Sequence, residues 1–188
     1  MASSKIRPSL SLANYLFLMS YFIFLGYSSR LQYSKENNSK DLISSTCNHT
    51  LYYQECVFSL RSDPNSKTAD LRGLANIALN ISIAYGSETL THISDLKTKT
   101  SKNDTNSSCL SDCVEQYNDA VEDLQEAIEA LRIRSLDTLK TLVSSAMTDS
   151  DTCEEGFEES GYGSPFANRN LYFSKLCSNF LAISNLLS

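Results

Sequence analysis

Apolar residues recur at spacings of three and four along most of this chain, and this periodicity limits its possible folds more than any other feature. The clearest stretch runs from Ser111 to Leu131, where the acidic residues lie away from one apolar stripe; the stripe consists of Val114, Tyr117, Val121, Leu124, Ile128 and Leu131. Such spacing is typical of an amphipathic helix. No segment shows the sustained alternation of a half-buried strand. The sequence therefore predicts an all-α fold.

Three further segments predict the remaining long helices. Each has an apolar face at helical spacing, and they span residues 68–99, 135–147 and 168–187. A polar loop is expected at 97–108, and another loop or a helix cap at 149–152. Residues 153–157 either extend the preceding helix or start another. Four amphipathic helices joined in this way predict an up-and-down bundle over residues 68–188.

Residues 42–62 predict a small helical hairpin in front of the bundle. Cys47 and Cys56 are nine positions apart, which is too far for them to meet along one continuous helix. A bend near residues 50–53 would bring them together. The turn signal Asp63-Pro64-Asn65-Ser66 then leads into the bundle. The domain expected from these patterns covers residues 42–188.

The first segment of the chain predicts export. A short basic start precedes a nearly apolar run from Leu10 to Tyr27, which is the pattern of a secretory signal peptide over residues 1–29. A membrane anchor is the alternative, although Asn14 and two serines dilute the run. Residues 30–41 predict a polar leader. We expect a secreted protein that has no membrane association once the signal is removed.

Cysteine usage agrees with export, because all six cysteines follow the apolar run. In exported chains, cysteines more often form disulfides than bind zinc. Five Asn-x-Ser/Thr sequons are candidate N-glycosylation sites in the same compartment, and the crowded pair near residue 103 is favoured. The acceptor residues are Asn37, Asn48, Asn80, Asn103 and Asn106.

The net charge is −6, and the acidic residues are unevenly distributed. Between Ser111 and Ser160 there are fourteen acidic and three basic residues. This argues against a nucleic-acid partner, which would require a basic stripe. The acidic block has two interpretations: a solvated helix face or a charged docking surface for another macromolecule.

The sequence has few of the groups that enzymes and metal sites need. Only two histidines are present, and the helical pair Glu88 and His92 is a poor set of metal ligands. Adjacent acids at 154–155 and 158–159 are typical of a solvated helix surface rather than of a glycosidase. Glycine-rich phosphate loops and the GxSxG and HExxH motifs are absent from the sequence. We therefore expect no enzyme activity, no metal and no other cofactor.

Five groups of residues match, in order and with their cysteines, the motifs of a known family. They are Leu42 to Cys47 with Tyr53 to Leu60, Ser62 to Pro64 with Asp70 to Ala75, Cys113 to Leu124, Ser144 to Met147 with Asp151 to Phe157, and Leu176 to Leu187. On these residues the chain resembles the plant invertase and pectin methylesterase inhibitor family. The resemblance covers residues 41–188.

The resemblance implies a four-helix bundle with an N-terminal hairpin and two disulfides. By matching position, these disulfides are Cys47–Cys56 and Cys113–Cys153. Cys177 is then expected to be a buried thiol, and Cys109 to be free or paired between chains. The resemblance also implies that the protein inhibits a target enzyme by docking on it, in a 1:1 complex, in the apoplast or cell wall.

Two target classes are open in this family, pectin methylesterase and acid invertase. The ending LAISNLL and the SDP and DLRGL motifs resemble the pectin methylesterase inhibitors, and residues 132–137 lack the Pro-Lys-Phe segment of the invertase-directed members. The sequence GYGSPF at 161–166 is similar to the invertase inhibitors, so acid invertase stays the alternative. A secreted carrier of small ligands is an alternative of another class, and it would need an internal cavity.

The resemblance also implies where the target is met. By matching position, the candidate contacts are Gln116, Asp119, Glu122, Asp123, Thr152 and Glu155. Gln116, Asp119 and Asp123 are three or four positions apart and so share one helix face. Asp119 and Asp123 are expected to be exposed. The alternative is that all six are only solvated surface residues.

Overall fold

The computed structural model describes residues 42–101 and 106–188. Within these ranges every regular element is helical: residues 42–47 are followed by α2 (Tyr53–Ser62), the 3₁₀ helix η1 (Pro64–Lys67), α3 (Leu71–Lys99), α4 (Asn106–Arg132), α5 (Leu136–Glu159) and α6 (Ala167–Asn185). The all-α prediction is confirmed. The signal peptide expected at 1–29, the leader at 30–41, and the acceptors Asn37 and Asn103 lie outside the described residues. None of the described helices is long and apolar enough to cross a membrane.

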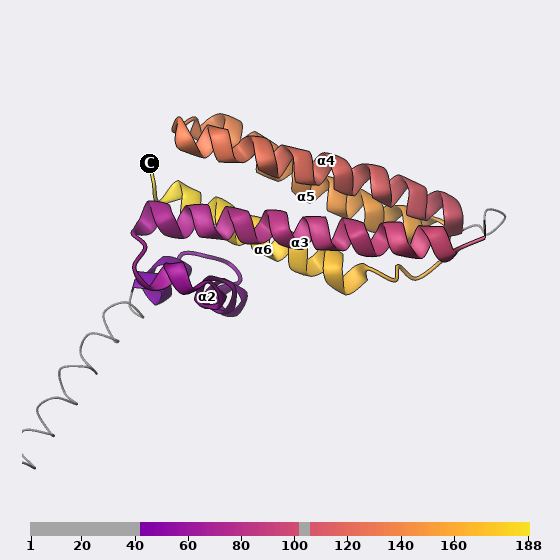
Figure 1. Cartoon of the computed structure of the whole chain (residues 1–188), viewed down its shortest axis with the longest axis horizontal. Coiled ribbons are helices and arrows are strands. Elements are labelled where there is room, and N and C mark those ends of the chain that lie inside the picture. The colour runs from indigo at the N-terminus through magenta and orange to yellow at the C-terminus, as the bar shows by residue number, and fades with distance from the viewer. Residues whose placement is uncertain (1–41, 102–105) are drawn as a thin grey trace, which may run out of the picture. The chain divides into compact units, whose positions relative to one another are not determined.

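The four long helices form a closed bundle (Figure 1). Each packs against its neighbours in the order α3, α4, α5, α6, and α6 packs back against α3, whereas the backbones of the diagonal pairs stay apart within the described residues. Short connections between successive helices make neighbours antiparallel. This is the up-and-down four-helix bundle that the sequence predicts.

The N-terminal hairpin packs against one side of the bundle. α2 packs against α3 and α6, and within the described residues its backbone does not come close to that of α4 or α5 (Figure 1). The Cys47–Cys56 disulfide closes the hairpin, with the two Cα atoms 5.7 Å apart. The Asn179 side chain of α6 binds the backbone of Tyr52, accepting from its N–H at 3.2 Å and donating to its carbonyl at 3.0 Å. The hairpin is therefore fastened to α6 by hydrogen bonds as well as by packing.

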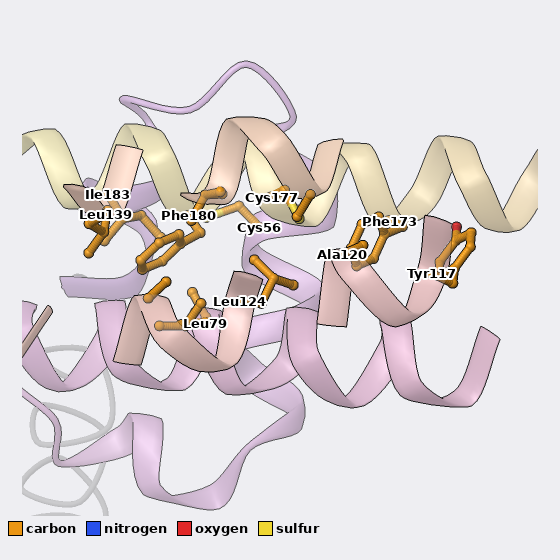
Figure 2. Packing of buried hydrophobic residues seen from close by; sticks show 14 of the residues in the cluster. Cys56, Leu79, Tyr117, Ala120, Leu124, Leu139, Phe173, Cys177, Phe180 and Ile183 are labelled. Atoms are coloured by element: carbon orange, nitrogen blue, oxygen red, sulfur yellow. The ribbon is translucent and has the colours of Figure 1, made fainter. Parts of the chain in front are cut away.

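Large side chains fill the centre of the bundle. Figure 2 shows Tyr117 and Leu124 of α4 beside Phe173, Phe180 and other residues of α6. Tyr117, Phe173 and Phe180 are fully buried, and the ring centroids of Tyr117 and Phe173 are 5.5 Å apart. A Cβ atom on Gly86 of α3 would come within 2.9 Å of the Phe173 ring and 3.2 Å of a Val121 methyl group. Gly86 therefore allows α3 to approach α4 and α6 closely.

The bundle helices α4 and α5 end in the same backbone motif. A residue with positive φ follows the helix, Arg134 at 62° after α4 and Gly161 at 74° after α5. The next N–H turns back to the helix, so that Ser135 donates to the carbonyl of Ala130 at 2.9 Å and Tyr162 to that of Phe157 at 3.1 Å. These bonds satisfy carbonyl groups that the helix end would otherwise leave unpaired.

The prediction of a loop or a helix cap at 149–152 is wrong, because α5 runs without interruption through these residues. The hydroxyls of Thr148 and Thr152 donate to carbonyls four residues earlier, at 3.1 Å and 2.9 Å. Ser150 is fully buried, and its Oγ lies 3.1 Å from that of Ser174 on α6. The polar side chains thus hydrogen-bond along the helix or to a neighbour rather than breaking it.

The polar loop expected at 97–108 is also shorter than predicted. α3 continues to Lys99 and α4 already begins at Asn106. Cys109 and Leu110 are buried and extend the apolar face of α4 by one turn towards its N-terminus. The hydroxyl of Ser111 donates to the carbonyl of Ser107 inside this turn, at 2.9 Å. Serine and asparagine are therefore helical here because buried neighbours anchor the turn.

Candidate docking surface

The outer face of α4 and α5 begins at a covalent link between the two helices. The disulfide Cys113–Cys153 joins them with a Cα–Cα distance of 4.7 Å. Both disulfides that the resemblance implies are thus present. Because α4 and α5 are antiparallel, residues that follow Cys113 lie beside residues that precede Cys153. The link therefore brings Gln116 and Asp119 of α4 to the level of the turn of α5 that precedes Cys153.

Three carboxyl groups gather on this face, Asp119 and Asp123 from α4 and Asp149 from α5. The Oδ2 atom of Asp149 is buried and makes no hydrogen bond within the described part of the chain. Burial, together with the nearby charges of Asp123 and Asp119, raises the pKa of Asp149 from its ordinary value of 3.8 to about 6. The cluster concentrates negative charge where α4 and α5 pack against each other.

The six candidate contacts differ in exposure. Asp119, Glu122, Thr152 and Glu155 are exposed, whereas Gln116 and Asp123 are half-buried. The expectation that Asp123 is exposed is therefore only partly met: Asp123 is half-buried, and it is close enough to Asp149 of α5 for its charge to raise the pKa of that carboxyl group. The structure brings Asp119 and Asp123 together with Asp149. For Glu122 and Glu155 it establishes exposure alone.

Sequence reasoning missed Asp149, because it placed this residue in a loop. In a continuous helix, residues four positions apart share a face, so Asp149 lies on the same face as Cys153. The position of Cys153 next to α4 was thus a signal that could have placed Asp149 opposite Asp119. It was overlooked because a run of Ser, Thr and Asp is usually typical of loops and caps.

The adjacent acids of α5 have separate roles. Glu154 is half-buried, and its Oε2 accepts a hydrogen bond of 2.7 Å from the Asn170 amide of α6. Glu155, Glu158 and Glu159 are exposed. Among the residues that the structure describes, no three His, Cys, Asp or Glu side chains are grouped so that they could hold a metal ion.

The two remaining cysteines are buried thiols. Cys177 is fully buried, and burial raises its pKa to about 12. Cys109 is 5% exposed, and its Sγ lies 3.2 Å from the Ser160 hydroxyl and 3.5 Å from the carbonyl of Gly156. Cys109 forms no disulfide with another cysteine of the described residues. At this exposure it is a poor partner for a second chain.

Together, these features define a disulfide-stapled helical bundle with an acidic face on α4 and α5. A model of the family described as plant invertase/pectin methylesterase inhibitor matches residues 41–183. The chain belongs to the plant invertase/pectin methylesterase inhibitor family.

Proteins named as invertase inhibitors and proteins named as pectinesterase inhibitors are both similar to this chain. A Platanus acerifolia protein named as an invertase inhibitor is 36% identical over 156 residues, which cover 79% of this chain and 87% of that protein. A pectinesterase inhibitor of Actinidia deliciosa is 30% identical over 173 residues, covering 92% and 93% of the two chains. The crystal structure of a mutant pectin methylesterase inhibitor from Arabidopsis is 25% identical, with a TM-score of 0.66, and the match covers 77% of this chain and 95% of that one.

Proposed function

We propose that this protein is a secreted inhibitor of pectin methylesterase that binds the enzyme through the acidic face of α4 and α5. The observation that carries the proposal is the cluster of Asp119, Asp123 and Asp149, held on two helices that a disulfide joins. In this proposal the protein acts in the cell wall, binds one enzyme molecule and performs no chemistry of its own.

The substrate of the proposed target explains why a carboxylate surface would bind there. Pectin is an anionic polymer, so a cleft that binds it must accept carboxylate groups. Asp119 and Glu122 can present carboxylates from an exposed helix without any change in fold. Charge complementarity of this kind mainly accelerates association and is screened by salt. The acidic face would then act by occupying the cleft entrance and excluding the polymer.

The test measures inhibition constants against a plant pectin methylesterase at low and at high salt. Wild-type protein is expected to inhibit at sub-micromolar concentration, which corresponds to about −8 kcal/mol or better. The variant Asp119→Asn with Asp123→Asn removes two charges and keeps the shapes of both side chains. It should bind more weakly at low salt and show a flatter dependence of affinity on ionic strength.

Asp95→Asn is the matched control, because Asp95 is an exposed aspartate on α3, the diagonal partner of α5. It should leave inhibition unchanged, and circular dichroism should show that all variants keep the helical fold. If the double variant inhibits as strongly as wild type at both salt concentrations, the α4–α5 face is not where the target binds.

Acid invertase is the second candidate target. The similarity to the Platanus acerifolia protein favours it, as does the GYGSPF sequence at 161–166. Residues 132–137, without a Pro-Lys-Phe segment, favour pectin methylesterase instead. Parallel assays of both enzymes separate the two, since loss of invertase activity with unchanged pectin methylesterase activity would make invertase the target. The carrier alternative needs an internal cavity, whereas aromatic side chains fill the bundle centre (Figure 2).

A further inference from the structure

We propose that Asn48 and Asn80 carry N-linked glycans, and that these glycans cover the hairpin and α3 side of the domain while the α4–α5 face stays bare for the partner. The proposal rests on the export and the docking face proposed above. Two of the five sequons would thus be occupied, and their glycans would determine from which side another protein can approach the bundle.

Asn48 lies in the turn that joins residues 42–47 to α2. Its side chain is exposed, and its N–H donates to the carbonyl of Ser44 at 3.0 Å. The sequon ends at Thr50, whose hydroxyl donates to the carbonyl of Cys47 at 2.8 Å. The backbone of the turn is thus fixed by its own bonds and by the neighbouring disulfide, while the Asn48 amide is left at the surface, where a bulky glycan is tolerated.

Asn80 lies on the outward stripe of α3. The exposed positions of this stripe are Asn76, Asn80, Ala84 and Glu88. The Nδ2 atom of Asn80 donates to the carbonyl and to the side-chain oxygen of Asn76, at 2.9 Å and 2.6 Å. An amide nitrogen has two hydrogens and a glycan replaces one of them, so one of these bonds can persist in the glycosylated protein.

Asn106 presents a different surrounding. It is the first residue of α4, is half-buried, and lines a pocket of about 260 Å³ with Leu110, Phe157 and other residues at that end of the bundle. A glycan at Asn106 would need the side chain to leave this position. We therefore expect Asn106 to be unmodified, in contrast to Asn48 and Asn80.

The two assigned acceptors share one side of the bundle. The hairpin that holds Asn48 packs on α3 and α6, and in the described part of the chain its helix α2 has no backbone close to α4 or α5 (Figure 1). The outward stripe of α3 points away from α5, because the two helices are diagonal partners in the bundle. Glycans at both positions would therefore shield the hairpin and α3 and leave the face with Asp119, Asp123 and Asp149 uncovered.

The first experiment maps the glycans. The full chain is secreted from a plant cell line, and its peptides are analysed by mass spectrometry before and after treatment with peptide N-glycosidase. Modified peptides are expected for Asn48 and Asn80, an unmodified one for Asn106, and loss of one glycan in each of Asn48→Gln and Asn80→Gln. A secreted protein that lacks the glycan at Asn48, at Asn80 or at both would overturn the proposal.

The second experiment places a glycan on the opposite face. Thr148→Asn creates a sequon on α5, beside the acidic cluster, that continues through Asp149 and ends at Ser150. This sequon resembles the native one of Asn80: in both, the acceptor position is exposed within a helix and the serine two residues later is fully buried. Thr148→Gln is the control without a sequon. If mass spectrometry finds the Thr148→Asn variant unmodified at the new sequon, Glu158→Asn provides a second sequon on α5 that ends at Ser160.

The expected result is that the glycosylated α5 variant inhibits pectin methylesterase at least about tenfold more weakly than Thr148→Gln, while Asn48→Gln with Asn80→Gln inhibits like wild type. A glycosylated α5 variant of full potency, or a loss of potency on removing the native glycans, would overturn the assignment of the bare face. A wild-type protein that does not inhibit the enzyme would instead refute the proposed function, and the glycan map would still decide the modification of Asn48 and Asn80.

Discussion

The phenol of Tyr117 donates a hydrogen bond of 2.7 Å to Oδ1 of Asn170, and both side chains are buried. The amide nitrogen of Asn170 in turn donates to Glu154 at 2.7 Å. Tyr117 lies on α4, Glu154 on α5 and Asn170 on α6, so this chain of bonds connects three helices inside the bundle. Burial raises the pKa of Tyr117, which keeps the phenol protonated as a donor.

Tyr117→Phe should destabilise the fold by about 1–3 kcal/mol, because it leaves Oδ1 of Asn170 buried without its donor. The free energy of unfolding in urea is the measurement. Tyr53→Phe is the control, since Tyr53 is 36% exposed and lies on the hairpin helix α2 rather than in the bundle centre; it should change stability by less than about 0.5 kcal/mol. Equal stabilities of Tyr117→Phe and wild type would mean that the hydrogen bond contributes nothing net.

Gly86→Ala and Gly156→Ala should have opposite effects, although both glycines are helical. Alanine is the better helix former by about 1 kcal/mol, and at Gly156 nothing lies within 4 Å of the added Cβ, so this variant should be more stable. At Gly86 the Cβ would meet the Phe173 ring at 2.9 Å, so overpacking should cost about 1–3 kcal/mol. Urea unfolding of both variants compares the effects, and a stabilised Gly86→Ala would show that Phe173 moves aside.

Gly86 also illustrates the limit of what the sequence could predict of the fold. The periodicity of apolar residues is a local signal, and it identified the four long helices and their order. It could not show that Gly86 allows close helix contact, because that depends on Phe173, which is 87 positions later. The loop expected at 149–152 failed for the same reason, since Ser150 is helical owing to burial against α6.

Asp149→Asn should remove part of the pH dependence of stability. The pKa of Asp149 is about 6 in the folded protein and 3.8 ordinarily, so between these values the folded state binds a proton that the unfolded state does not. Stability should therefore fall as pH rises from about 4 to 6 and remain lower above that range. At pH 7 the variant should be more stable than wild type by about 1 kcal/mol, a discounted figure because the carboxyl is partly exposed.

Thermal unfolding of both proteins at pH 4 and pH 7 measures this difference. Glu122→Gln serves as the control, because Glu122 is an exposed acid of the same face that does not contribute to the shift of Asp149. An Asp149→Asn variant with the same stability difference from wild type at both pH values would contradict the raised pKa.

Arg134→Gly should stabilise the protein by about 0.5–1 kcal/mol. Arg134 has a φ of 62°, a conformation that costs a residue with a side chain about 1–2 kcal/mol. Glycine avoids this cost, but part of the gain in stability is offset by the greater freedom of glycine in the unfolded chain. Arg134→Ala is the matched comparison, since it removes the same charge and retains a Cβ. Urea midpoints that are equal for the glycine and alanine variants would show that the turn is not strained.

The candidate surface was less predictable than the fold. The resemblance supplied the disulfides and six contact positions, and the spacing of Gln116, Asp119 and Asp123 indicated a shared face. The relation of this face to Asp149 depends on how α4 and α5 pack, which no local pattern contains. The closeness of Asp123 to Asp149 has the same origin, since the two residues belong to different helices.

The Cys113–Cys153 disulfide has a consequence for how the protein would withstand proteolytic cleavage. Its two cysteines are 40 positions apart in the sequence. The segment between them includes the exposed turn with Ile133 and Arg134 that connects α4 to α5. A single cut in this turn would leave both halves covalently attached and held side by side by the packing of α4 on α5. A nicked molecule would therefore migrate as an intact chain until the disulfide is reduced, and cleavage there would not by itself separate the acidic groups contributed by the two helices.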